Sequence, residues 1–189
     1  RGALFPALKS IGLQDEEVRR AWAAMGYGAW QTEELLATWR RYVIDQGEWQ
    51  AARYAGYSTK AVDITAYWRP TLQGLKSKHY QDEADKALPA VVFGMVGRVG
   101  RVGQQRMALL TDLIRTDLSD PSKTALQTRL LRQLAENLAE DEMPVLDAGF
   151  KLKTLFQAGL ERFVLRLATN FTARRNFLPE YEGGRPAEY

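Results

Sequence analysis

The stretch Ala61-Val-Asp-Ile-Thr-Ala-Tyr67 decides the fold class, because it is short, β-branched and apolar and so predicts a strand. Before it, residues 1–56 are predicted to form a helical N-terminal segment of three short helices. The first begins with acidic residues at 15–17, the second begins at Thr32, and Trp49–Tyr54 form the third. Two interpretations of this segment stay open: a DNA-binding unit of helix-turn-helix size, or a plain helical appendage that packs on the next domain.

The rest of the chain, 57–189, is predicted to be one domain of alternating strands and helices. After the first strand and a loop from Pro70 to Lys86, the order is β, β, α, β, α, β, which predicts an α/β fold with a mixed sheet flanked by helices. The predicted elements are strands at Ala90–Val96, Gln105–Leu110, Pro144–Asp147 and Arg162–Ala168, and helices from Ser122 to about Glu140 and over Leu152–Ala158. The tail from Thr172 to Tyr189 has no clear period.

The composition excludes several classes of protein. With 46% hydrophobic and 26% charged residues, the 189-residue chain is typical of a globular protein. No stretch approaches 18 uncharged apolar residues, so we expect no membrane-spanning helix. The chain has no cysteine and a single histidine, which excludes disulfides, thiolate zinc sites and multi-histidine metal sites. A net charge of +3 permits binding to nucleic acid without requiring it.

Two aspartates are the strongest candidates for chemistry. Asp63 lies inside an apolar strand, and Asp147 ends another and is followed by Ala148 and Gly149. An aspartate among apolar residues costs desolvation energy unless it is paired or binds a cation. If the two strands are neighbours, the two carboxylates can hold Mg²⁺ or Mn²⁺ against a phosphodiester. The alternative is that each aspartate only caps a helix or closes a turn.

Basic residues in three places are candidates for contacts with a phosphate backbone. Glycines recur at every third position in Gly94-Met-Val-Gly-Arg-Val-Gly-Arg-Val-Gly103, which predicts a flexible hairpin carrying Arg98 and Arg101. The stretch lacks the features of a phosphate-binding Walker loop, and a hairpin that only packs closely is the alternative. The other candidates are Lys76 and Lys78 beside His79, and Arg174 and Arg175 near the end of the chain.

Four segments in this order resemble the insertion-sequence transposases of bacteria that use a DDE catalytic triad. They are Lys60-Ala-Val-Asp-Ile-Thr-Ala-Tyr-Trp-Arg-Pro70, Lys86-Ala-Leu-Pro-Ala-Val-Val-Phe-Gly94, Val145-Leu-Asp-Ala-Gly-Phe150 and Arg162-Phe-Val-Leu-Arg166. The resemblance covers about residues 57–178. It implies a ribonuclease-H-like catalytic core, with Asp63 on the first strand and Asp147 after the fourth as catalytic metal ligands.

The resemblance also implies the reaction, the cofactor and the partners. These are Mg²⁺- or Mn²⁺-dependent cleavage and strand transfer at transposon ends, double-stranded DNA as substrate, a homodimer on DNA, and a bacterial cytoplasmic, nucleoid-associated location without membrane attachment. The family uses a third carboxylate, usually a glutamate on a later helix. The late acids Glu180, Glu182 and Glu188 lie among prolines and glycines. We therefore expect that glutamate beyond Tyr189 and the chain to be an incomplete core, inactive alone.

Two other functions stay open on the sequence. One is a ribonuclease-H-like nuclease that cuts DNA without joining it. The other is a non-catalytic protein that binds DNA or another partner through its helices, with an inert sheet domain. Binding of a divalent metal that depends on Asp63 separates the catalytic interpretations from the non-catalytic one.

Overall fold

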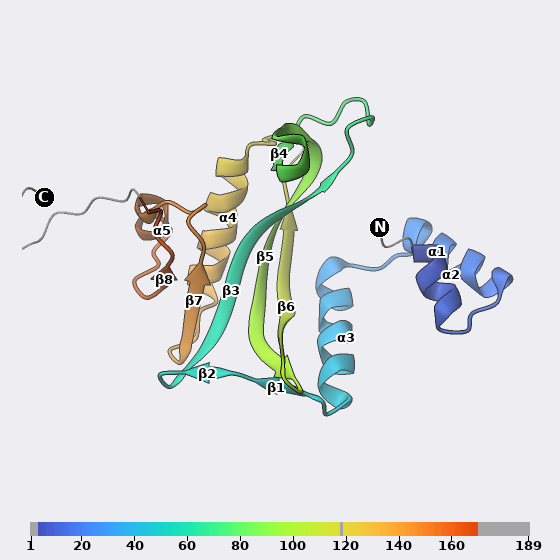
Figure 1. The fold of residues 1–189 in the computed structure, drawn as a ribbon, viewed down its shortest axis with the longest axis horizontal. Helices are drawn as coiled ribbons and strands as arrows, with labels where there is room; N and C mark the ends of the chain where they lie inside the picture. The colour runs from blue at the N-terminus through green and yellow to red at the C-terminus, as the bar shows by residue number, and fades with distance from the viewer. Residues whose placement is uncertain (1–3, 118, 170–189) are drawn as a thin grey trace, which may run out of the picture.

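The computed structural model describes residues 4–117 and 119–169, and it has a mixed sheet of eight strands with helices packed against it (Figure 1). The helices are α1 (Leu4–Ser10), α2 (Asp15–Tyr27), α3 (Thr32–Asp45), α4 (Lys123–Glu136), α5 (Leu152–Gln157) and a short 3₁₀ turn at Asp82–Ala84. The strands are β1 (Trp49–Ala51), β2 (Arg53–Tyr54), β3 (Tyr57–Trp68), β4 (Lys78–Gln81), β5 (Lys86–Val102), β6 (Gln105–Arg115), β7 (Glu142–Leu146) and β8 (Val164–Leu165). The expectation of an α/β fold with a mixed sheet flanked by helices is confirmed.

The order of the main strands across the sheet is β6, β5, β3, β7, β8. The chain runs from β3 to β5 and β6 as an antiparallel meander. It then crosses back through α4, and β7 pairs parallel with β3 while β8 pairs parallel with β7. This order is consistent with the ribonuclease-H-like fold expected from the resemblance. The chain adds β5 and β6 on one side of β3 and then adds β7 and β8 on its other side. The boundary between β3 and β7 is therefore the topological switch point of the sheet.

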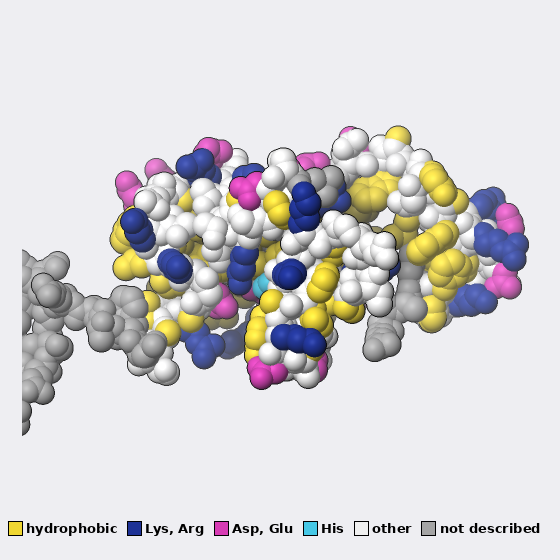
Figure 2. Space-filling view, turned by 90° about the horizontal axis from the view of Figure 1, so that it is seen from above, with side chains coloured by type: hydrophobic (Ala, Val, Ile, Leu, Met, Phe, Trp, Pro, Cys, Tyr) yellow, Lys and Arg dark blue, Asp and Glu magenta, His cyan; other side chains and the backbone are white. Residues whose placement is uncertain are grey.

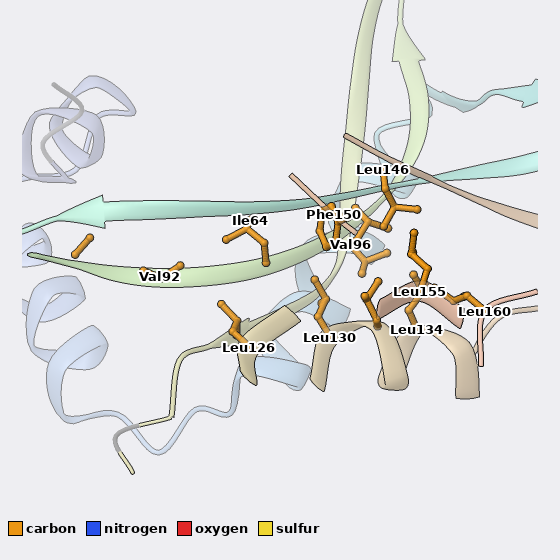
Figure 3. Packing of buried hydrophobic residues seen from close by; sticks show 13 residues of the cluster. Ile64, Val92, Val96, Leu126, Leu130, Leu134, Leu146, Phe150, Leu155 and Leu160 are labelled. Carbon is orange, nitrogen blue, oxygen red and sulfur yellow. The ribbon is translucent and has the colours of Figure 1, made fainter. Parts of the chain in front are cut away.

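The main core lies between one face of the sheet and α4 (Figure 3). Alternate residues of β3 and β5 point into it because side chains in a strand alternate between two faces. They meet an apolar stripe of α4 at helical spacing, and α4 begins where Ser122 Oγ accepts a hydrogen bond from the Ala125 N–H at 3.1 Å. The buried residues of this core include Val62, Ile64, Val92, Val96, Leu126, Leu130, Leu131, Leu134, Leu146, Phe150, Leu155 and Leu160.

An ion pair fixes the register of the parallel pair β3–β7. Lys60 Nζ lies 2.8 Å from Glu142 Oε2, and both side chains are largely buried. A one-residue slip of β7 would leave both charges without a partner in a poorly solvated place, which is costly. The pair therefore favours a single register, in which Val62 is opposite Leu146.

Residues 49–54 form two strands, so the prediction of a third helix there is wrong. β1 pairs with the end of β5, and β2 pairs with the start of β3. The Trp49 indole N–H also donates a hydrogen bond to the Met107 carbonyl of β6 at 3.1 Å. These partners lie far away in the sequence, so local helical spacing could not reveal them. The predicted boundary at residue 56 stays a prediction, although β1 and β2 are parts of the sheet.

The glycine-rich stretch is also a strand rather than a flexible hairpin. Residues 94–102 belong to the 17-residue strand β5, and the turn is only Gly103-Gln104. The glycines make room for neighbours instead. A Cβ on Gly94 would lie 2.9 Å from a methyl carbon of Leu130, and one on Gly100 would lie 2.4 Å from the Trp49 ring. Close packing of other elements on β5 therefore accounts for Gly94 and Gly100, whereas Gly103 belongs to the turn and has open space around it.

The predicted loop before β5 contains strand β4, and the predicted last strand is shortened to Val164–Leu165. Helices α1 and α2 carry exposed apolar side chains, among them Trp22 at 54% and Tyr27 at 93% exposure. Figure 2 shows hydrophobic side chains gathered on the side of the molecule where these helices lie. None of the helices in the described ranges is long and apolar enough to cross a membrane.

Candidate functional site

Asp63 and Asp147 follow directly after the last paired residues of β3 and β7. Val62 and Leu146 are the last opposite residues of this parallel pair, so Asp63 is the next residue of β3 and Asp147 is the first residue after β7. Neighbouring strands lie about 5 Å apart, which would bring the two backbones to roughly that separation. Both aspartates are exposed, and both lie at the switch point of the sheet, where open α/β sheets bind their ligands.

The Asp63 carboxylate occupies the place where β7 has ended. The Ile64 N–H donates a hydrogen bond to Asp63 Oδ1 at 2.7 Å. Along β3, the Ser58 N–H donates toward the β7 side, to the Asp141 carbonyl, and alternate N–H groups follow it in that direction. The Ile64 N–H is the first of these groups that lies beyond the end of β7, and the Asp63 carboxylate accepts its hydrogen bond in place of a β7 carbonyl.

The Asp147 carboxylate is held by a tight turn that runs to Phe150. The Gly149 N–H donates to Asp147 Oδ1 at 2.9 Å, and the Gln127 side-chain amide of α4 donates to the Gly149 carbonyl at 3.1 Å. A Cβ on Gly149 would lie only 3.1 Å from Asp147 Oδ1, so this position favours glycine. Phe150 is 4% exposed and packs in the main core. Gly149 and Phe150 therefore both help to fix the position of the Asp147 carboxylate.

The free oxygens of the two aspartates are suited to a divalent cation. Each Oδ1 accepts one backbone N–H, and each Oδ2 has no protein donor among the described residues. No lysine or arginine in the described ranges lies within 4 Å of either carboxylate. Carboxylate oxygens are the ligands that Mg²⁺ prefers, usually one or two of them together with waters and phosphates. Within residues 4–117 and 119–169, however, no group of three or more possible ligands gathers at one place.

His79 lies close enough to Asp63 for their charges to interact. It is on β4, half-buried, with its ring centroid 6.0 Å from that of Trp68, whose indole N–H donates to the His79 carbonyl at 3.1 Å. Burial lowers the pKa of His79, and Lys123 lowers it further, whereas Asp63 and Asp82 act in the opposite direction. The sequence indicated only an exposed loop here, because the pairing of β4 with β5 left no local signal.

The predicted phosphate contacts fall at the two ends of β5. Lys76 and Lys78 are exposed in or before β4, which pairs with the first residues of β5. Arg101 is exposed near its last residues, and Arg98 is half-buried and donates to Ser58 Oγ at 3.1 Å. Arg174 and Arg175 lie outside the described residues. The structure therefore does not gather these residues into one cluster, and their contact with DNA stays a prediction.

Along β5, the residue opposite Asp63 lies midway in sequence between the partner of Lys78 and Arg101. Asp63 is opposite Met95, which is six residues from Pro89, the partner of Lys78, and six from Arg101 (95 − 89 and 101 − 95). At about 3.3 Å per residue, Arg101 is roughly 20 Å from Met95 along β5, whereas His79, next to Lys78, lies close enough to Asp63 for their charges to interact.

Comparison with known proteins gives little further information. No protein-family model and no curated protein matches the chain. Two solved structures of NurA are weakly similar. The first has 14% sequence identity and a TM-score of 0.23, and the match covers 75% of this chain and 30% of the NurA chain. The second is NurA bound to dAMP and manganese. It has 11% identity and a TM-score of 0.17, and the match covers 72% of this chain and 29% of the NurA chain. The chain thus spans less than a third of either NurA chain, and likenesses of this size carry no conclusion about its function.

Proposed function

We propose that this chain carries two metal-binding carboxylates, Asp63 and Asp147, of a DDE-type transposase core that acts on DNA phosphodiesters. The observation that carries the proposal is the pair itself. Two aspartates without basic partners each follow directly after the last opposite residues of β3 and β7, at the switch point, and each has one oxygen fixed by the backbone and one available. Like charges side by side are destabilising, so this arrangement favours a bound cation that offsets the repulsion.

The protein groups around the pair have separate tasks in this proposal. A divalent cation bound there would polarise the phosphodiester and the attacking hydroxyl. The Ile64 and Gly149 N–H groups hold one oxygen of each aspartate, which would leave the other oxygen of each to bind a cation. Phe150 and Gln127 fix the turn that carries Asp147 and so limit its movement. Because the described residues offer only these two carboxylates at the site, the chain alone is expected to bind the metal without turning over DNA.

Calorimetry with Mn²⁺ tests the metal site directly. The unsubstituted chain should bind Mn²⁺, and Asp63→Asn and Asp147→Asn should each weaken binding at least tenfold, because each removes one charged ligand. The asparagine side chain in Asp63→Asn would keep an oxygen for the Ile64 N–H, so the local backbone should not change. Asp82→Asn, on the 3₁₀ turn, is the matched control and should bind Mn²⁺ normally. Equal Mn²⁺ binding by all four proteins would refute the site.

An assay on DNA tests the expected inactivity of the chain. The purified 189-residue chain should show no Mg²⁺-dependent nicking of supercoiled DNA. Nicking that is lost in Asp147→Ala would show that the described residues, or those after 169, complete the site. If such activity is found, joining of a DNA 3′ end to a target separates a transposase from a nuclease that only cuts.

A further inference from the structure

We infer that Arg101 and Arg106 form a second functional pair, a clamp for one DNA backbone phosphate at a fixed distance from Asp63. The inference rests on the proposed function for the choice of DNA as ligand. Its starting point is the pairing of the two arginines, which are directly opposite each other on β5 and β6 and are both exposed.

The geometry places two positive charges together without an acid. Opposite residues of an antiparallel pair have Cβ atoms about 5 Å apart on the same face, where like charges destabilise the sheet. No carboxylate of the described residues lies within 4 Å of either guanidinium. Gln50 of β1 accepts hydrogen bonds from Arg101 Nε and NH2 at 3.3 and 3.1 Å, which orients that guanidinium. A phosphate between the two groups would offset the repulsion and accept hydrogen bonds from both.

The surface around the pair is hollowed and has room for a phosphate. A cavity of about 460 Å³ is lined by residues 51–54 and by both strands next to the turn, including Arg101 and Arg106. Gly103 has φ +57° at the first position of the two-residue turn, a conformation that favours glycine and keeps the hairpin short. The two arginines therefore sit in a concave place near the tip of β5–β6.

The opposite face of the same hairpin is held rigid. Trp49 lies against Gly100, and its indole N–H reaches the Met107 carbonyl, so it spans from β1 across β5 to β6. Because residues alternate between faces, Gly100 and Arg101 point to opposite sides of β5. The arginine pair is thus carried by three paired strands and a close tryptophan contact instead of a free loop.

The pair lies on the face of the sheet that also carries Asp63. Asp63 is opposite Met95, and Met95 and Arg101 are an even number of residues apart on β5, where the pairing with β3 shows no bulge. The separation along the strand is about 20 Å. Successive phosphates of one DNA strand advance about 3.4 Å along the axis, so the clamped phosphate would lie about six nucleotides from the one at the aspartates.

The first test measures DNA binding by fluorescence anisotropy, with a labelled duplex of roughly 40 base pairs and mixed sequence at increasing NaCl. The unsubstituted chain should lose affinity steeply with salt. Arg101→Ala/Arg106→Ala should lower the slope of log K against log salt by about one, because the pair neutralises one phosphate. The charge-matched control Arg41→Ala/Arg132→Ala, at exposed helix positions, should keep the slope. An unchanged slope in the Arg101/Arg106 double variant, or no binding by the unsubstituted chain, would overturn the clamp.

The second test measures the spacing and uses the absence of cysteine. Thr65→Cys, on the face of Asp63, can be joined by a disulfide to a thiol-bearing nucleotide, which fixes the register of the DNA. A single uncharged methylphosphonate is then moved along the strand. Thr65 is opposite Phe93, eight residues from Arg101, so the tether is about 26 Å from the arginine pair along β5. Cross-linking should fall most when the uncharged linkage is about seven to nine nucleotides from the tether, and Arg101→Ala/Arg106→Ala should remove this dependence. An equal effect at every position would refute a clamp at this distance.

The two proposals fail independently. Loss of Mn²⁺ binding in Asp63→Asn with a normal salt slope supports the metal site without involving the arginines. A flattened salt slope in the arginine variant of a chain that binds no Mn²⁺ would retain the clamp and refute the proposed catalytic function.

Discussion

Two pairs of like charges lie on one face of this sheet, and they are built in different ways. Asp63 and Asp147 follow the ends of a parallel pair, and each is fixed by a backbone N–H from its own strand or turn. Arg101 and Arg106 are opposite each other within an antiparallel pair, and one is oriented by Gln50. The first pair depends on a turn held by the core, and the second on a close contact between strands. We therefore expect a substitution in the main core to disrupt the aspartate pair, and a substitution at the contact between β1 and β5 to disrupt the arginine pair.

The largest expected effect is on the aspartate pair, through Phe150→Ala. Phe150 is buried in the main core, so its removal should cost about 3–5 kcal/mol of the free energy of unfolding and release the Asp147 turn. Urea denaturation measures the stability, and calorimetry should show weakened Mn²⁺ binding in the folded fraction. Phe156→Ala is the control, because Phe156 is 60% exposed and should cost far less. Equal costs for both would show that the core does not hold the turn.

A smaller effect is expected on the arginine pair, through Gly100→Ala. The added Cβ would lie 2.4 Å from the Trp49 ring and 2.6 Å from the Gln50 carbonyl, so β1 must move. We expect a loss of about 1–3 kcal/mol in thermal or urea unfolding, together with a lower salt slope for DNA. Gly26→Ala, in helix α2 with open space around it, should instead be neutral or stabilising. A Gly100→Ala chain as stable as the control would disprove the close contact.

The third effect concerns the charges of the aspartate pair and should change sign with metal. Without metal, Asp63→Asn removes repulsion and should raise stability by less than about 1 kcal/mol. With excess Mg²⁺ the unsubstituted chain should gain stability by binding, whereas the variant should not. Differential scanning fluorimetry with and without Mg²⁺ measures both. The prediction fails if the substitution lowers stability in the absence of metal.

The smallest effect is on the titration of His79, the only histidine of the chain. Because burial lowers its pKa, NMR of the imidazole C–H should give a value below the ordinary 6.5. The folded state then disfavours the protonated form, so His79 contributes stability above pH 6.5 that is lost as the pH falls through its folded pKa. Asp63→Asn should lower the pKa further, since Asp63 raises it. Mg²⁺ bound at Asp63 should also lower the pKa of His79. If neither Asp63→Asn nor Mg²⁺ changes the pKa of His79, Asp63 is too far from His79 for their charges to interact.

The parts of the fold that depend on local pattern could be predicted from the sequence. The alternation of apolar residues in β3, the apolar spacing of α4 and the cap at Ser122 are all local signals, and both of these elements were found. Asp63 and Asp147 could be named for the same reason, since each interrupts or ends an apolar strand. Their adjacent register required the parallel pairing of β3 with β7, which the order of elements alone does not determine.

The parts that depend on distant partners could not be predicted. Trp49–Ala51 becomes a strand only because the end of β5, far along the sequence, offers a partner. Arg106 was missed because its relation to Arg101 depends on the exact turn, and the glycine pattern placed the bend too early. The closeness of His79 to Asp63 depends on contacts between β4 and β3, such as the hydrogen bond from the Trp68 indole to the His79 carbonyl, and it has no signature in either segment.

The short segment Trp49–Tyr54 has a consequence for how such a chain can be recombined. Its two strands pair with β5 and with β3, so this segment joins the strand of Arg101 to the strand of Asp63. A helical module could be exchanged between chains only if the break falls before Trp49, near Gly47, where φ is +75° and helix α3 has ended. A break at residue 56 would replace Trp49 with a residue of the other chain, which need not fit against Gly100. Chimaeras joined at these two points should therefore differ in folding even though they exchange the same helices.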